Sequence, residues 1–268
     1  MPVVATTDPH EVRRLCDEVV ALDPVVHTVF GTIAEWTARE GASVWAAHPA
    51  DAPTTLAARS RADTPVALTD GWGDVRARAG LLAVLDPPPA ALAGPPQTVG
   101  ALAGLLGLPV IRRMSERLFR LDELVEPTGV EGRARRATLD DFDVLVAWYA
   151  DFEVEAIGRQ QPGQDAAVRA GIESGGCWVW LDGADELCSF AQRRPAVDGV
   201  SRIGPVYTPP RLRGHGYGSA ATAAATRDVL AEGAVACLYT DLANPTSNKI
   251  YQALGYVPVL DRTMVSYD

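Results

Sequence analysis

The stretch RLRGHGYGSA, residues 211–220, determines how this sequence is interpreted. It follows a strand-like segment, SRIGPVYT (201–208), and leads into the alanine-rich segment SAATAAATRDVLAEG (219–233). Because that segment has no glycine or proline before its end, it predicts a helix that Gly233 terminates. The first N–H groups of a helix lack partners and, with the helix dipole, attract anions. We therefore expect this loop to bind an anion.

The composition of the loop favours phosphate as that anion. Gly214, Gly216 and Gly218 permit positive φ angles and a close approach of the backbone to a ligand. Arg211 and Arg213 supply cationic donors that match phosphate oxygens. We interpret His215, which also lies in the loop, as a spacer rather than as a base.

Known phosphate-binding loops match this stretch to different degrees. A Walker A loop requires a lysine after its last glycine, and none is present here. The dinucleotide fingerprint G-x-G-x-x-G/A is nearly matched, with Ser219 at its third small position and Asp241 at the end of the next predicted strand. That fold needs several further strand–helix units, and only 27 residues follow Asp241. A dinucleotide-binding oxidoreductase is therefore a minor alternative.

Two motifs together resemble those of the GCN5-related N-acetyltransferase (GNAT) superfamily. Residues 213–218, RGHGYG, resemble its Arg/Gln-x-x-Gly-x-Gly/Ala signature. Residues 244–256, NPTSNKIYQALGY, are similar to its second segment, in which an Asn, a small residue, a Tyr and a Gly–aromatic pair recur at these spacings. RRATLDDFD (135–143) resembles the opening strand and first helix, so the resemblance covers roughly 133–268.

The resemblance implies an acyl-CoA-dependent N-acyltransferase with acetyl-CoA as donor. The loop would bind the pyrophosphate through backbone amides, and the preceding strand would offer N–H groups to the acyl carbonyl and the pantetheine arm. An amine would attack the thioester directly, since no activated nucleophile is apparent. The residues that the resemblance assigns to the cofactor are Val206, Tyr207, Thr208, Arg211, Arg213, Gly214, His215, Gly216, Tyr217, Gly218, Ser219, Asn244, Ser247 and Tyr251.

The same resemblance makes Tyr251 the candidate general acid. A phenol with a pKa of about 10 is protonated at neutral pH and can donate to a thiolate whose conjugate acid lies near ~8.5. Asn244 would bind the cofactor, cap the helix that begins near Pro245, or do both. SRIGPVYT has no carboxylate, which departs from the family pattern, so the general base is unassigned. Glu153 and Glu155 are its candidates.

The missing strand carboxylate leaves a second class of function open. A non-catalytic acyl-CoA sensor would keep the loop and lose the chemistry. The amine acceptor, a small molecule or a peptide, is not specified by any stretch, and the sequence does not indicate an oligomeric state.

Glycine and proline punctuate LDELVEPTGVEGRARRATLDD (121–141), which predicts a linker between two domains, 1–128 and 133–268. We expect an α/β (α+β) protein whose second domain has a mixed, largely antiparallel central sheet flanked by helices. The first domain repeats a similar order and predicts a diverged copy. Its expected helices are 9–22, 26–39 and 97–107, and its expected strands are SVWAAH (43–48), PVALTD (65–70), GLLAVLDPP (80–88) and ERLFRL (116–121).

The first domain lacks the glycine loop. We place its equivalent at LDPPPAALAGPPQTVGALAGLL (85–106), which has prolines where amide donors are needed and no arginine. This half is therefore expected to have lost cofactor binding and to support the fold or wall the acceptor pocket.

Composition excludes several other classes. The net charge of −10 argues against nucleic acid as a partner. Apolar runs are far shorter than the ~20 residues of a membrane span, and no signal peptide is apparent, so a cytoplasmic location with no membrane partner is expected. The four cysteines form no CxxC pair, which predicts buried thiols and no metal site.

Overall fold

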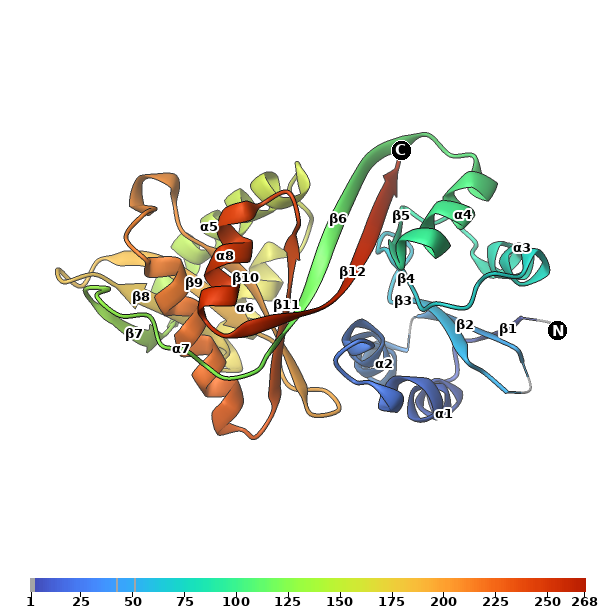
Figure 1. The fold of residues 1–268 in the computed structure, drawn as a ribbon, viewed down its shortest axis with the longest axis horizontal. Coiled ribbons are helices and arrows are strands. Elements are labelled where there is room, and N and C mark those ends of the chain that lie inside the picture. The colour runs from blue at the N-terminus through green and yellow to red at the C-terminus, as the bar shows by residue number, and fades with distance from the viewer. Residues whose placement is uncertain (1–2, 42, 51) are drawn as a thin grey trace. The chain divides into compact units, whose positions relative to one another are not determined.

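The computed structural model describes residues 3–41, 43–50 and 52–268, which form two compact units (Figure 1). Unit 1 comprises the chain up to Leu118 together with Val259–Asp268, and unit 2 comprises Phe119–Pro258. The units differ from the expected boundaries, since the last ten residues belong with the N-terminal part. The reason is strand pairing, because residues 263–266 lie antiparallel to residues 91–94. Such a partner choice leaves no local signal in the sequence.

Unit 1 begins with a strand and two helices and continues as an alternation of strands and helices. Its elements are β1 (Val4–Thr6), α1 (Pro9–Val19), the 3-10 turn η1 (Val20–Leu22), α2 (Thr28–Glu40), β2 (Val44–His48), β3 (Thr55–Arg59), β4 (Val66–Leu68), α3 (Val75–Val84), β5 (Ala91–Gly94), α4 (Pro96–Leu106) and most of β6 (Val110–Leu121), which continues into unit 2 from Phe119.

Unit 2 repeats this order. Its elements are β7 (Arg133–Arg136), η2 (Leu139–Asp141), α5 (Phe142–Ile157), α6 (Gln164–Glu173), β8 (Cys177–Leu181), β9 (Leu187–Arg193), β10 (Val200–Tyr207), η3 (Pro210–Leu212), α7 (Tyr217–Ala231), β11 (Val235–Asp241), α8 (Pro245–Ala253) and the start of β12 (Tyr256–Tyr267), which continues into unit 1 from Val259.

Strand pairing shows that the two halves share one topology. In unit 1, β1 to β4 pair antiparallel in sequence and β4 pairs parallel with β5. In unit 2, β7 to β10 pair antiparallel and β10 pairs parallel with β11. The next strand in each sheet comes from the other half of the chain, because β12 follows β5 and β6 follows β11. The mixed, mostly antiparallel sheet and the diverged duplication are confirmed, and a doubly wound dinucleotide-binding sheet is excluded.

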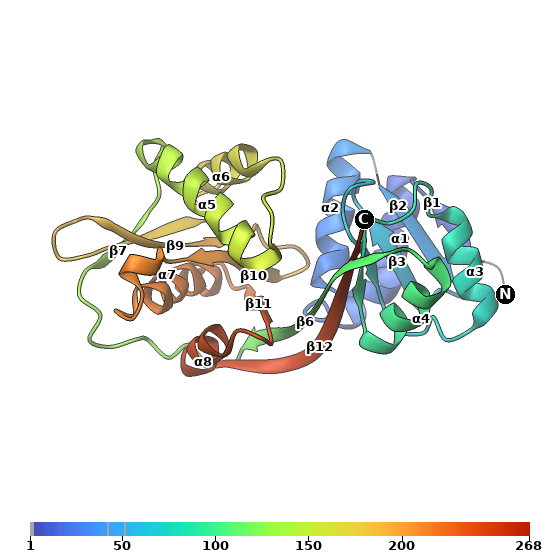
Figure 2. The ribbon, with the colours of Figure 1, turned by 90° about the horizontal axis from the view of Figure 1, so that it is seen from above.

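Alternating side chains on the strands supply a core on each face of each sheet. On β2, Trp45 packs with α1 and α2, and its neighbour Ala46 packs with α3 and α4. On β9, Phe190 faces α5 and α6, and Ala191 faces α7. Figure 2 shows α5 and α6 on one side of the unit 2 sheet and α7 on the other. Packing against one face of the unit 2 sheet positions α7, the helix that follows the glycine loop.

The predicted elements of unit 2 agree with the structure more closely than those of unit 1. Thr138 forms the expected helix N-terminus as part of a capping box with Asp141. In unit 1, GLLAVLDPP was expected as a strand, and this is wrong, because most of it lies in α3. A short apolar run fits a buried helix as well as a strand. The strands β3 and β5 were missed, since both are buried along their whole length and show no alternation.

Candidate functional site

The glycine loop lies where the sequence places it, between β10 and α7. Gly216 is the N-cap of α7 and has a φ of +82°, with no side chain capping the helix. The first intrahelical amide bond runs from Ala220 to Gly216, at 3.0 Å. The amides of residues 217–219 are therefore the orphan donors of this helix. Since none is capped by a side chain, this end of α7 has the features of an anion-binding helix terminus.

Two of the loop glycines pack closely against neighbouring side chains of unit 2. A Cβ on Gly216 would lie 2.8 Å from Cγ2 of Val130, and a Cβ on Gly218 would lie 3.1 Å from Oγ1 of Thr208. Gly214 has a φ of +85°, but a Cβ there would meet no atom within 4 Å. The loop is thus held close to the linker segment and to the end of β10. Substitution of Gly216 would disturb the protein as well as any ligand.

β10 and β11 separate beside this loop. Their parallel pairing covers only Val200–Arg202 against Val235–Cys237. From Ile203 to Tyr207, β10 continues without β11 as a partner, and its register against β9 shifts between Ile203 and Val206. The backbone edge of β10 that faces away from β9 is left open there. N–H groups on such an edge can bind an extended ligand or a carbonyl oxygen.

The end of β10 is fixed by Ser189 of β9. The Ser189 hydroxyl donates to the carbonyl oxygen of Tyr207 at 2.8 Å and lies 2.9 Å from the hydroxyl of Thr208. Ser189 is fully buried. The open edge and the glycine loop therefore meet where buried Ser189 hydrogen-bonds the end of β10.

The two arginines of the loop differ in their surroundings. Arg213 donates from Nη2 to both carboxylate oxygens of Glu155, at 2.8 and 2.7 Å, and from Nε to the carbonyl of Thr208 at 2.9 Å. Arg211 is exposed and forms no hydrogen bond or ion pair with any other described residue. Of the two predicted phosphate ligands, Arg211 is thus the one whose guanidinium is available.

The second motif forms the start of α8 and the strand after it. The Asn244 side chain accepts from the backbone N–H of Ser247 at 3.0 Å, so the capping role is present. Tyr251 is partly buried against Tyr256, with ring centroids 6.2 Å apart. Burial raises the pKa of Tyr251 to about 12. The phenol is therefore protonated at neutral pH, and its hydroxyl has no hydrogen-bond partner among the described residues.

The two candidate bases at the end of α5 are both engaged. Oε2 of Glu153 accepts from the backbone N–H of Gln161 and from Nε2 of Gln164, both at 2.8 Å. Glu153 thereby ties the segment after α5 to the start of α6. Glu155 is the partner of Arg213. The structure brings Glu155 to the glycine loop and gives Glu153 a local structural contact, and a base role for either stays a prediction.

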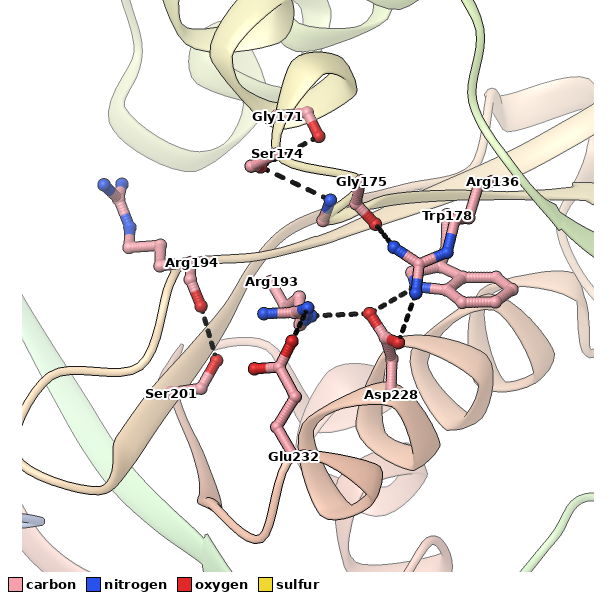
Figure 3. A network of polar contacts seen from close by, with 11 residues as sticks. Arg136, Gly171, Ser174, Gly175, Trp178, Arg193, Arg194, Ser201, Asp228 and Glu232 are labelled. Atoms are coloured by element: carbon pink, nitrogen blue, oxygen red, sulfur yellow. Dashed lines mark hydrogen bonds and ion pairs between the residues drawn. The ribbon is translucent and has the colours of Figure 1, made fainter.

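The opposite end of α7 is fixed by a partly buried ionic cluster that the sequence did not reveal (Figure 3). Asp228 of α7 accepts from Nε of Arg193 at 2.6 Å, from Nη2 of Arg136 at 2.6 Å and from the Trp178 indole at 3.2 Å. Arg193 also bonds Glu232. The only available signal was an aspartate inside an alanine-rich helix. This cluster holds α7 against β7, β8 and β9 and so sets the position of its N-terminus.

The described residues contain neither a disulfide bond nor a cluster of metal-ligating side chains. All four cysteines are buried, and none is part of a disulfide bond. Among the residues that the structure describes, no group of three or more His, Cys, Asp or Glu is placed to hold a metal ion. Within the same residues, no helix is both long and apolar enough to cross a bilayer.

Comparisons with known proteins agree with this geometry. Residues 185–265, which contain both motifs, match the family model of the FR47-like proteins. A Drosophila structural-genomics protein has a TM-score of 0.72 at 14% identity, covering 99% of this chain and 98% of its own. No curated protein matches.

Two further solved structures carry the family description. An acetyltransferase of the GNAT family from Colwellia psychrerythraea has a TM-score of 0.62 at 10% identity, with 100% of both chains covered. A GCN5-related N-acetyltransferase from Sphaerobacter thermophilus has a TM-score of 0.61 at 13% identity, covering 98% of this chain and 94% of its own. The fold is therefore that of the GCN5-related N-acetyltransferases, and the resemblance seen in the two motifs is confirmed.

Proposed function

We propose that unit 2 binds an acyl-CoA, with acetyl-CoA as the donor, and transfers the acyl group to the nitrogen of an amine. One observation carries this proposal: the open edge of β10 beyond Arg202 leads directly to an uncapped helix N-terminus. An extended arm that ends in a pyrophosphate fits such an edge followed by an anion site. The glycine loop, Arg211 and Asn244 would hold the cofactor.

Acyl-CoA would supply a thioester whose carbonyl carbon accepts the amine nitrogen as the C–S bond breaks. The N–H groups of residues 206–208, at the end of β10, would stabilise the negative charge on the carbonyl oxygen. Tyr251 would protonate the departing sulfur, because its phenol is protonated and its hydroxyl is free to donate. The amine would lose its proton to solvent or to a carboxylate near the end of α5.

The direct test is thiol release from acetyl-CoA in the presence of a panel of amines that contains polyamines, amino acids, aminoglycosides and peptide N-termini. Turnover with at least one amine, above a control without amine, is expected. Thermal unfolding with CoA or NAD serves as the companion measurement, since a ligand that binds the folded chain raises its Tm. Stabilisation by NAD but not by CoA would contradict the proposal.

A non-catalytic acyl-CoA sensor is the second candidate. The observation that favours it concerns the candidate bases: β10 carries no carboxylate, and Glu153 and Glu155 of α5 are both engaged. CoA-dependent stabilisation without turnover on any amine of the panel would support the sensor over the enzyme.

A further inference from the structure

The contact between α5 and the glycine loop has a specific chemistry. Glu155 lies in the last turn of α5, which ends at Gly158 in the left-handed conformation. A carboxylate near a helix C-terminus is disfavoured by the helix dipole, so it needs a cation nearby. Arg213 supplies that cation through Nη2, which contacts both carboxylate oxygens.

The side chain of Arg213 connects the two ends of segment 208–213, which precedes Gly214. It follows the 3-10 turn η3, and its extended conformation, with φ −75° and ψ 160°, turns the side chain back toward the end of β10. There Nε donates to the carbonyl of Thr208, and the guanidinium carbon lies 5.7 Å from the centroid of the Tyr207 ring. One side chain therefore closes the segment 208–213 and links it to α5.

These contacts leave little of Arg213 for a phosphate. Its Nε and Nη2 already donate to Thr208 and Glu155, whereas Arg211 has no partner among the described residues. The two arginines thus have different roles in the loop. Arg211 is placed to contact an anion, and Arg213 holds the backbone that supplies the amide donors.

We propose that Glu155 is a positioning residue, which acts through Arg213 to hold the glycine loop in its acyl-CoA-binding conformation, and that it is not the base for the acceptor amine. This inference rests on the proposed function of unit 2. Glu155, which the sequence offers as a candidate base, is thereby given a role in cofactor binding.

The test compares Glu155→Gln with Asp151→Asn in the full-length chain. Asp151 is exposed, lies one turn earlier on α5, and forms no hydrogen bond or ion pair with another described residue. Its substitution removes the same charge from the same helix. Glu155→Gln should raise the Kd for CoA about threefold to fivefold, the range expected for loss of a partly exposed ion pair. Asp151→Asn should leave the Kd within twofold.

A double-mutant cycle with Arg213→Gln makes the measurement specific. Because Glu155 acts through Arg213, the double variant should bind CoA no more weakly than Arg213→Gln alone. With the acceptor found by the amine panel, Glu155→Gln should raise KM for acetyl-CoA and leave kcat and its pH profile unchanged. Glu155→Asp should recover part of the affinity.

Each alternative outcome has a distinct meaning. Tighter CoA binding by Glu155→Gln would overturn the inference, since the carboxylate would then only compete with the pyrophosphate for Arg213. A large loss of kcat with an altered pH profile would also overturn it and would identify Glu155 as the base. If the unaltered chain does not bind CoA at all, the proposed function itself fails.

Discussion

The two halves of the chain have the same topology, but they differ at one equivalent strand end. That strand is β10 in unit 2 and β4 in unit 1. In unit 2, β10 extends five residues beyond its pairing with β11, and the loop that follows is open. In unit 1, β4 ends at Leu68, and a Cβ on Gly94 of β5 would lie 2.6 Å from the Leu68 carbonyl oxygen. The strands of unit 1 therefore stay together to the end of β4. The comparison indicates that the candidate cofactor site depends on the open edge of β10 and not on the fold alone.

The structure also corrects where the counterpart of the glycine loop lies. It is residues 69–74, between β4 and α3, and not the proline-containing stretch 85–106. Counted back from each helix N-cap, Trp72 stands where unit 2 has Gly214. Trp72 is 1% exposed, and its indole donates to the Leu56 carbonyl at 3.2 Å.

The helix termini after the two loops differ in charge. The N-cap of α3 is Asp74, whose carboxylate accepts from the amide of Arg76 at 3.1 Å. Arg78 donates from Nη1 to the carbonyls of Trp72 and Gly73. A capped, acidic N-terminus does not attract phosphate. The start of α3 is therefore occupied by Trp72 and Asp74 rather than by prolines, and loss of cofactor binding in this half stays a prediction.

The largest expected effect concerns the tryptophan that fills the unit 1 loop. Trp72→Ala should lower the free energy of unfolding by about 3–5 kcal/mol, because it leaves a cavity in the core. Gly214→Ala at the matched position of unit 2 should cost only about 1–2 kcal/mol, from its positive φ. Chemical denaturation measures both. Equal effects would show that Trp72 has no special role in closing unit 1.

The second prediction concerns Tyr251, whose counterpart by helix position in α4 is the buried Leu102. Tyr251→Phe should lower kcat about 100-fold and leave CoA affinity unchanged. The phenol is active while protonated and is lost only as pH rises toward its pKa of about 12. The ratio of the two kcat values should therefore stay constant between about pH 6 and 9. A ratio that falls with rising pH would contradict the assignment.

The third prediction concerns the free arginine of the loop. Arg211→Gln should weaken CoA binding about tenfold, since it removes one charged donor without disturbing a protein contact. Arg76→Gln is the matched control, because Arg76 is exposed beside the unit 1 loop. Calorimetry should show no change in CoA affinity for the control. Equal losses would mean that the charge of the whole protein, and not the loop, governs affinity.

Local patterns predicted the parts of the fold and site that depend on neighbouring residues. The glycine loop, the helix after it and the cap at Asn244 follow from spacing and from backbone preferences. The pairing of residues 263–266 with β5 and the Asp228 cluster depend on residues far apart in the chain. The engagement of Glu155 by Arg213 is of the same kind, since the two residues are 58 positions apart. No single-sequence pattern reports such contacts.

A calorimetric titration of CoA into the full-length chain tests the difference between the two halves most directly. The open edge of β10 and the closed loop of unit 1 predict one CoA per chain, with the stoichiometry unchanged in Trp72→Ala under conditions where that variant is folded. Two molecules of CoA per chain, or no binding, would contradict this account.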